Sequence, residues 1–257
     1  MVEHRWARPQ WYESIDSTNR AVLADPVLGV VVVADHQSQG QGRRGRTWTA
    51  PPGTALAVSV SVPSVPPARR GWVPLLAGLA VARALREHPD GISAGLKWPN
   101  DVMVTGPGEP EPRKVCGILA AARPDVLVIG AGLNIDQSRD QLPTPLATSW
   151  TLALGGPVRR DVRTSWLTAY LDQLAELLDG LARGAPEPAD DYRRSCQTIG
   201  AQVRIDLPGG EAVLGVARRV DDQGALVVRT EDGEQTYHAG DVIHLRPQPD
   251  PDGGPPR

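Results

Sequence analysis

The sequence predicts an α+β protein: a large core domain with a mixed or antiparallel sheet, followed by a small antiparallel β-barrel. Strands and helices do not alternate as repeating βαβ units, which argues against a parallel α/β sheet. Leucines recur at helical spacing over Asp161–Leu181, and after about residue 190 the chain changes to short strands separated by turns. We therefore place the core at residues 1–190 and the barrel at 191–246, and we expect residues 247–257 to form a disordered tail.

The first half of the chain gives clear local signals. Asp16–Asn19 is typical of a helix N-cap, so a short helix should follow to residue 24. Residues 29–35 hold four consecutive valines and predict a buried strand, whereas residues 36–48 are too polar and glycine-rich for regular structure. Thr54–Val62 alternates small with larger apolar side chains, which predicts a strand with one well-buried face.

The remaining core elements follow in order from periodicity and from turn residues. We predict a helix at 72–85, short strands at 96–98 and 102–104, a mobile loop at 106–113, central strands at 115–121 and 126–132, the helix at 161–181, and a linker at 183–190.

Composition excludes several classes of protein. The chain has 257 residues, with 27 basic against 30 acidic side chains and a formal net charge of −3, which argues against a general nucleic-acid binder. No apolar run approaches the ~20 residues that a membrane helix needs, and the first residues lack the apolar segment of a signal peptide. Two cysteines, Cys116 and Cys196, make neither a disulfide framework nor a cysteine zinc site. We expect a cytoplasmic protein.

The segment Gly40–Trp48 carries three glycines and three arginines directly after a predicted strand. Glycines let the backbone approach a ligand, and arginines bind carboxylates or phosphates. This pattern predicts a loop that closes over an anion, although a solvated basic loop or an RNA-binding Arg/Gly segment has a similar composition.

Three further segments suggest chemistry. Lys97–Asp101 (Lys-Trp-Pro-Asn-Asp) places a lysine and a carboxylate around a proline turn, which suits phosphates and Mg²⁺ but also fits an ordinary hairpin. Lys114 precedes the apolar strand that contains Gly117, and a lysine in that position is often only a solubilising residue. Gly130–Asn134 lacks the third glycine of a dinucleotide fingerprint, which argues against a dinucleotide site. The amide of Asn134 suits the edge of a base, but the segment also fits a strand end loosened by glycines.

The distribution of two rare residue types links these segments. The chain has only two lysines, Lys97 and Lys114, and only three asparagines, Asn19, Asn100 and Asn134. All five lie in these segments or in the Ser17-Thr18-Asn19 element, whereas neutral surface positions would be scattered. The segments therefore predict one shared ligand site.

In combination, these residues resemble the biotin protein ligase family, the biotin–[acetyl-CoA-carboxylase] ligases. The similarity runs in the family's order over residues 15–135 and rests on Ser17-Thr18-Asn19, Gln37, Gly40–Trp48, Lys97–Asp101, Lys114–Leu119 and Gly130–Asn134. It implies a class II aminoacyl-tRNA-synthetase-like catalytic core followed by an SH3-like domain. Since the Ser-Thr-Asn element begins at residue 17, we expect a short form without the N-terminal DNA-binding domain of some relatives.

The resemblance implies a ligase that acts in two steps. Biotin and MgATP give biotinyl-5′-AMP and pyrophosphate, and a lysine on a biotin carboxyl carrier domain of a biotin-dependent carboxylase then displaces AMP. The implied partners include no nucleic acid and no membrane, and a sheet edge could pair two copies as a homodimer.

The resemblance also implies a role for each matching residue. The implied biotin-binding residues are Ser17, Thr18, Asn19, Gln37, Gln41, Gly42, Arg43, Lys114 and Gly117. The implied catalytic residues are Arg43, Lys97 and Lys114, the implied nucleotide-binding residues are Arg43, Arg46, Trp48 and Asn134, and Asp101 would meet the metal. Gln41 stands where the family's loop usually has its first arginine, so one cation is lost.

Two other functions fit parts of the pattern. A lipoate- or octanoate-transferring relative would also use a lysine before an apolar strand, but the Arg-rich loop and the Lys-Trp-Pro-Asn-Asp run speak against it. A nucleic-acid-binding module could use Arg43, Arg44 and Arg46, but the acidic net charge disfavours it.

Overall fold

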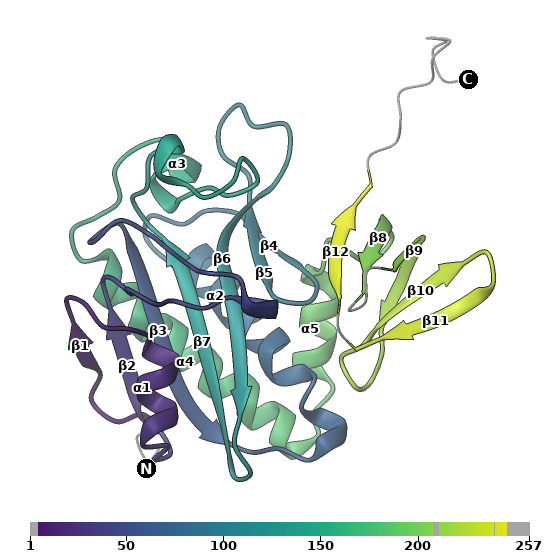
Figure 1. Cartoon of the computed structure of the whole chain (residues 1–257), viewed down its shortest axis with the longest axis horizontal. Helices are drawn as coiled ribbons and strands as arrows, with labels where there is room; N and C mark the ends of the chain where they lie inside the picture. Colours follow the sequence, from purple (N-terminus) through teal and green to yellow (C-terminus); the bar gives the residue numbers. More distant parts are fainter. Residues whose placement is uncertain (1–4, 208–210, 239, 246–257) are drawn as a thin grey trace.

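A seven-stranded mixed sheet forms the centre of the core domain in the computed structural model, which describes residues 5–207, 211–238 and 240–245 (Figure 1). The strands are β1 (Gln10–Tyr12), β2 (Val31–Ala34), β3 (Ala55–Pro63), β4 (Ala94–Lys97), β5 (Asp101–Val104), β6 (Arg113–Ala122) and β7 (Val126–Asn134). Their order across the sheet is β1-β2-β3-β7-β6-β5-β4, with β1 parallel to β2 and every other neighbouring pair antiparallel. The predicted mixed sheet is confirmed.

Helices cover both faces of this sheet. The helices are α1 (Thr18–Ala24), α2 (Trp72–Glu87), α3 (Trp150–Leu154), α4 (Val162–Arg183) and α5 (Glu187–Ser195), with short 3₁₀ turns at Arg43–Gly45, Pro67–Arg69 and Arg139–Gln141. On one face α2 packs against the sheet and against α4 and α5, and on the other α1 lies across β2, β3 and β7 (Figure 1).

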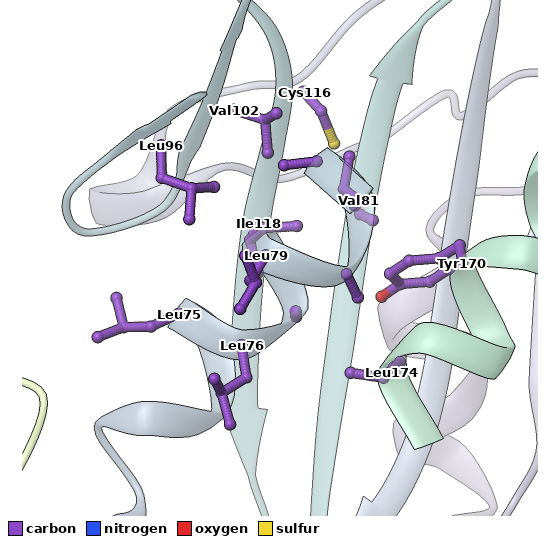
Figure 2. Packing of buried hydrophobic residues seen from close by; sticks show 14 of the residues in the cluster. Leu75, Leu76, Leu79, Val81, Leu96, Val102, Cys116, Ile118, Tyr170 and Leu174 are labelled. Atoms are coloured by element: carbon purple, nitrogen blue, oxygen red, sulfur yellow. The ribbon is translucent and has the colours of Figure 1, made fainter. Parts of the chain in front are cut away.

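The main hydrophobic core lies between α2, α4 and the sheet. Leu79 of α2 is 1% exposed and belongs to the same cluster as Val102, Cys116 and Ile118 of the sheet. Tyr170 and other α4 side chains complete this cluster, part of which Figure 2 shows. Because α2 is apolar almost all round, it suits the middle of a layered core.

The prediction that β3 has one buried face was wrong, because both faces are buried. Leu56 and Val58 point into the main core, as expected from the alternation. The opposite face is covered by α1, and there Ser59 lies 2.7 Å from the Thr18 hydroxyl. Small side chains on that face leave room for the helix to approach.

The C-terminal part is a five-stranded antiparallel sheet, which agrees with the predicted small β domain. Its strands are β8 (Gln202–Asp206), β9 (Ala212–Val220), β10 (Leu226–Thr230), β11 (Gly233–Tyr237) and β12 (Asp241–His244), in the order β11-β10-β9-β8-β12. Residues 208–210, where the sequence Pro-Gly-Gly is typical of a turn, and the predicted tail at 247–257 lie outside the described residues.

The predicted linker at 183–190 is mostly helical, because α5 starts at Glu187. This helix runs through the boundary that we placed between residues 190 and 191, and it packs on α2 and α4. Tyr192 of α5 is 1% exposed and meets Trp72 edge to face. On packing, α5 therefore belongs with the core.

Two tryptophans attach the C-terminal sheet to the core. Trp98 Nε1 donates to the Gly224 carbonyl at 3.0 Å, and Trp72 Nε1 donates to the Asp222 carbonyl at 2.9 Å. Both acceptors lie in the turn between β9 and β10. Since Trp98 is also part of the Lys-Trp-Pro-Asn-Asp segment, this contact ties the candidate site to the second domain.

We predict that Leu79→Ala lowers the free energy of unfolding by about 3 kcal/mol, because it leaves a cavity in a core that cannot collapse fully. Urea unfolding followed by circular dichroism measures the change. Leu214→Ala is the matched control, since Leu214 is 60% exposed and should cost less than about 0.5 kcal/mol. Equal losses in the two variants would contradict the assigned core.

Candidate active site

A cavity of about 490 Å³ lies where α1, the Gly40–Trp48 loop, the β4–β5 turn and strands β6, β7 and β12 meet. Every residue that the sequence singled out for the site lines it: Ser17, Thr18, Asn19, Gln37, Gln41, Gly42, Arg43, Arg46, Trp48, Lys97, Asp101, Lys114, Gly117 and Asn134. The fold thus brings together segments that are up to 117 residues apart (134 − 17).

Glycines on two adjacent strands form the floor of the cavity. Gly117 of β6 pairs in register with Gly132 of β7, and Gly130 lies two residues along the same strand. A Cβ on Gly132 would stand 2.7 Å from the Trp48 indole, and one on Gly130 would stand 2.5 Å from Asn19 Oδ1. The glycines are therefore required for close approach of side chains to the sheet.

A buried polar network lies at the start of α1. Ser17 caps the helix, and the Thr18 backbone N–H and hydroxyl both donate to Gln37 Oε1, at 2.8 and 3.0 Å. The Ser59 hydroxyl lies within hydrogen-bonding distance of Thr18 and Asn19. Because Gln37 Oε1 already accepts two bonds, its amide N–H groups are the part left to meet a ligand.

The Gly40–Trp48 loop is a tight hairpin. Gln41 pairs with Thr47, the Gly42 N–H donates to the Arg46 carbonyl at 2.7 Å, and the Trp48 N–H donates to Gly40 at 2.9 Å. The prediction that residues 36–48 are irregular therefore misses this hairpin and the 3₁₀ turn at its tip, where Arg44 adopts a φ of 56°. The backbone hydrogen bonds of the hairpin fix the positions from which its arginine side chains extend.

The arginines of this loop reach the C-terminal sheet. Arg43 Nη1 donates to the Asn100 side chain at 3.0 Å and to the Gly240 carbonyl at 3.3 Å. Arg44 and Arg46 both pair with the carboxylate of Asp241, at the start of β12. The second domain therefore holds the loop over the cavity, and sequence reasoning gave no signal for Asp241.

Positive charge exceeds negative charge inside the cavity. Asp101 Oδ1 lies 2.5 Å from Lys114 Nζ, and Lys97 and Arg43 are its other cationic neighbours. Burial lowers the pKa of Lys97 and of Arg43, and Asp101 opposes this shift for both groups. Three cations around one carboxylate favour an anionic ligand.

Asn134 organises the opposite wall of the cavity. Its side-chain amide donates to the Thr148 carbonyl at 3.0 Å and accepts from Gln137 at 2.9 Å. These bonds leave one N–H and one lone pair for a ligand. The segment 143–147 lines the cavity next to Asn134, and no sequence motif indicated it.

Other lining residues were also missed. They include Met103, Asp206, Val242 and Ile243. Asn100, which the rarity of asparagine had assigned to the shared site, also lines the cavity. The β12 residues come from the second domain and carry no local signal.

Cys116 is the thiol nearest to the candidate site among the described residues. Cys116 lies beside the site, but burial raises the pKa of its thiol to about 12, so it does not ionise at neutral pH. Among the described residues, no group of three metal-ligating side chains comes together, and no helix there is long and apolar enough to cross a membrane.

His244 links β12 to the Lys-Trp-Pro-Asn-Asp segment. Its Nε2 lies 3.0 Å from the Thr198 hydroxyl, which accepts a bond from the Trp98 N–H at 3.0 Å. The Thr198 hydroxyl therefore keeps its proton for donation to Nε2 of a neutral His244 imidazole. Burial and the nearby Lys97 lower the pKa of His244 to about 4.

Comparison with known proteins defines the class. The Biotin/lipoate A/B protein ligase family matches residues 11–136, and the Biotin protein ligase C terminal domain matches residues 198–245. The chain is 37% identical over 237 residues to the biotin–[acetyl-CoA-carboxylase] ligase of Mycobacterium tuberculosis, covering 90% of this chain and 85% of that protein. The chain belongs to the biotin protein ligase family.

Solved structures agree with this assignment. The biotin protein ligase of Aquifex aeolicus in complex with biotin and ATP matches with a TM-score of 0.77 and 26% identity, over 94% of this chain and 100% of that one. The ligase of Leishmania major in complex with biotinyl-5-AMP matches with a TM-score of 0.58 and 26% identity, over 93% and 98% of the two chains. The class II synthetase-like core and the SH3-like domain expected from the sequence are confirmed as the family fold.

We predict that Gly132→Ala lowers the catalytic rate at least tenfold, because a Cβ 2.7 Å from the indole must displace Trp48. The rate of pyrophosphate release with biotin and ATP measures the effect. Gly156→Ala is the control, because a Cβ at Gly156 meets nothing within 4 Å. Equal activity in both variants would contradict a role for the glycine floor.

We predict that His244 makes the fold sensitive to acid. Below pH 6.5 the unfolded chain protonates this imidazole, whereas the folded protein resists protonation until about pH 4, so the free energy of unfolding falls over that interval. Urea unfolding at pH 7, 6, 5 and 4.5 should show a shallower fall in His244→Gln. His88, whose pKa burial also lowers, keeps part of the dependence. Identical slopes in parent and variant would refute the prediction.

Proposed function

We propose that this protein uses ATP to convert biotin into biotinyl-5′-AMP and then transfers the biotinyl group to a lysine of a biotin carboxyl carrier domain. The observation that carries the proposal is the cluster of cations at one end of the cavity, where Arg43, Lys97 and Lys114 surround the carboxylate of Asp101. The reaction brings a carboxylate and a triphosphate together, and these anions repel each other unless cations are already in place.

Lys114 and Arg43 assist the first step. The biotin carboxylate attacks the α-phosphorus of ATP, a new O–P bond forms, and the bond to the β-phosphate breaks to release pyrophosphate. Lys114 reaches the carboxylate and the transferring phosphate from the start of β6, and Arg43 reaches them from the loop. Lys97 stabilises the leaving phosphates, and all three cations act without a covalent enzyme intermediate.

The polar network at the start of α1 holds the head of biotin. Ser17, Thr18, Asn19 and Gln37 supply donors and acceptors at the cavity wall, which suits a ring carrying both N–H and C=O groups. Gln41 and Gly42 cover this group from the loop. Gly117 leaves the space that the biotin carboxylate needs beside Lys114, since a Cβ there would lie 3.0 Å from Lys114 Nζ.

The nucleotide lies toward Asn134. Trp48 offers an aromatic face to the adenosine, and Arg46 offers a positive charge. Asn134 offers the adenosine the N–H and the lone pair that its own hydrogen bonds leave unused. The substrates thus meet above Gly117 and Gly132, which lie between the two ends of the cavity.

Asp101 suits Mg²⁺ when phosphates supply the other ligands. Its Oδ1 is buried, and it is a hard oxygen donor; magnesium commonly binds through one or two carboxylates plus substrate phosphates. The cation would neutralise charge on the phosphates.

In the second step the lysine amine of the carrier attacks the acyl carbon of the adenylate, an amide bond forms, and AMP leaves. The loop held by Asp241 keeps water from the mixed anhydride until the carrier arrives. We place the reaction in the cytoplasm.

The lipoate or octanoate alternative has less support. The matching family profile covers both kinds of ligase, but the relatives reported above are named as biotin ligases. A test of acid specificity separates the two functions.

We predict that the purified protein forms biotinyl-5′-AMP from biotin and MgATP, and that Lys114→Ala lowers this rate at least 100-fold because one developing charge loses its partner. Mass spectrometry of the adenylate measures both.

Arg229→Ala, at an exposed cation of β10, is the control and should retain the parent's rate. Product with lipoate or octanoate but not with biotin would move the protein to the sister activity. No adenylate with any acid would overturn the proposal.

A further inference from the structure

We propose that Glu109 is a positioning residue for the nucleotide: its buried carboxylate holds the cavity wall formed by residues 143–147 in place before ATP binds. The proposal rests on the proposed function for the identity of the ligand. Glu109 lies in the loop between β5 and β6 and does not itself line the cavity. It acts through two arginines.

Glu109 is a carboxylate buried between guanidinium groups. Its side chain is only 9% exposed, Oε2 lies 3.1 Å from Arg113 Nε, and Oε1 pairs with Arg139 Nη2. Neither oxygen makes another hydrogen bond among the described residues. A largely buried charge with two cationic partners depends strongly on both of them.

The loop around Glu109 is built to bury this carboxylate. The Glu109 N–H donates to the Gly106 carbonyl at 3.1 Å, which closes a turn. A Cβ on Gly106 would lie 3.1 Å from the Leu152 carbonyl of α3 and 3.5 Å from the Glu109 carboxyl carbon. The loop that we predicted to be mobile is therefore fastened between α3 and the two arginines.

The same two arginines hold the cavity wall. Arg113 donates to the Pro145 carbonyl, and Arg139 Nη1 donates to the Ala147 carbonyl at 3.3 Å. The wall also runs beside Lys114, whose N–H donates to Leu146 at 2.8 Å. One carboxylate thus fixes the two guanidinium groups that reach the wall beside Lys114.

Neutralising Glu109 should release the wall. Arg113 and Arg139 would then repel each other, because the carboxylate between them is gone. Water would also compete with the Pro145 and Ala147 carbonyls for the two guanidinium groups. ATP would have to order the segment as it binds, which weakens binding without changing the bound geometry. The hydrogen bonds between Thr18 and Gln37 do not involve Glu109, so biotin binding should not change.

The decisive experiment measures steady-state adenylation for Glu109→Gln. The expected result is a rise of about tenfold in KM for ATP, with kcat and KM for biotin within about twofold of the parent. Glu231→Gln is the matched control, because Glu231 is exposed in the hairpin between β10 and β11. A change in kcat with KM for ATP unaltered, or equal rises in KM for both substrates, would overturn the proposal.

A double-mutant cycle tests whether Glu109 acts through Arg139. We expect Arg139→Gln to raise KM for ATP by a similar factor, and the double variant to be no worse than either single one. We call the ion pairs of Glu109 with Arg113 and Arg139 the clamp. Additive effects would mean that Glu109 and Arg139 act separately, and would overturn the proposal that they work as a clamp.

A second readout does not depend on activity. Trypsin should cut after Arg139 at least fivefold faster in Glu109→Gln than in the parent, and a non-hydrolysable ATP analogue with biotin should slow this cleavage. Equal cleavage rates would overturn the clamp even if the enzyme is active. Faster cleavage in a protein that forms no biotinyl-5′-AMP would instead support the clamp and refute the proposed function.

Discussion

The site depends on one ion pair, between Lys114 of β6 and Asp101 of β5, and on the strand register that creates it. Asp101 lies opposite Lys97 in β4 and opposite Gly117 in β6, so three neighbouring strands contribute to one end of the sheet. A slip of one residue would turn these side chains to the other face. The hydrophobic pattern that buries Val102 and Ile118 against α2 therefore also places the charges of the site.

The close approach of side chains to the sheet follows from the same register. Gly117 and Gly132 are paired, so two positions without a side chain lie next to each other on adjacent strands. Lys114 and Trp48 fill part of that space. A reactive carboxylate and phosphate fit between cations here only because β6 and β7 present bare backbone.

The sequence predicted most of the core elements because their periodicity is local. It also predicted the cavity-lining residues of the quoted motifs, since rare lysines and asparagines gathered in a few segments. It did not indicate Asp241, Glu109 or residues 143–147. These residues act through contacts between segments far apart in the chain, and one acidic side chain in a polar loop has no local pattern that distinguishes it from a solvated residue. The same limit explains β3, whose second buried face depends on α1.

The two walls of the cavity are held by ion pairs of different character. Arg46 and Asp241 hold the loop from positions where their side chains are 63% and 28% exposed, so water and salt can weaken that pair. Glu109 is 9% exposed, and screening reaches it less easily. The wall formed by the Gly40–Trp48 loop is thus the one that can open at a small cost in free energy. A two-step ligase needs this asymmetry, because the adenylate must stay bound on one side while the other side admits a carrier lysine. The buried clamp fixes the nucleotide half, and the exposed pair leaves the loop free to move.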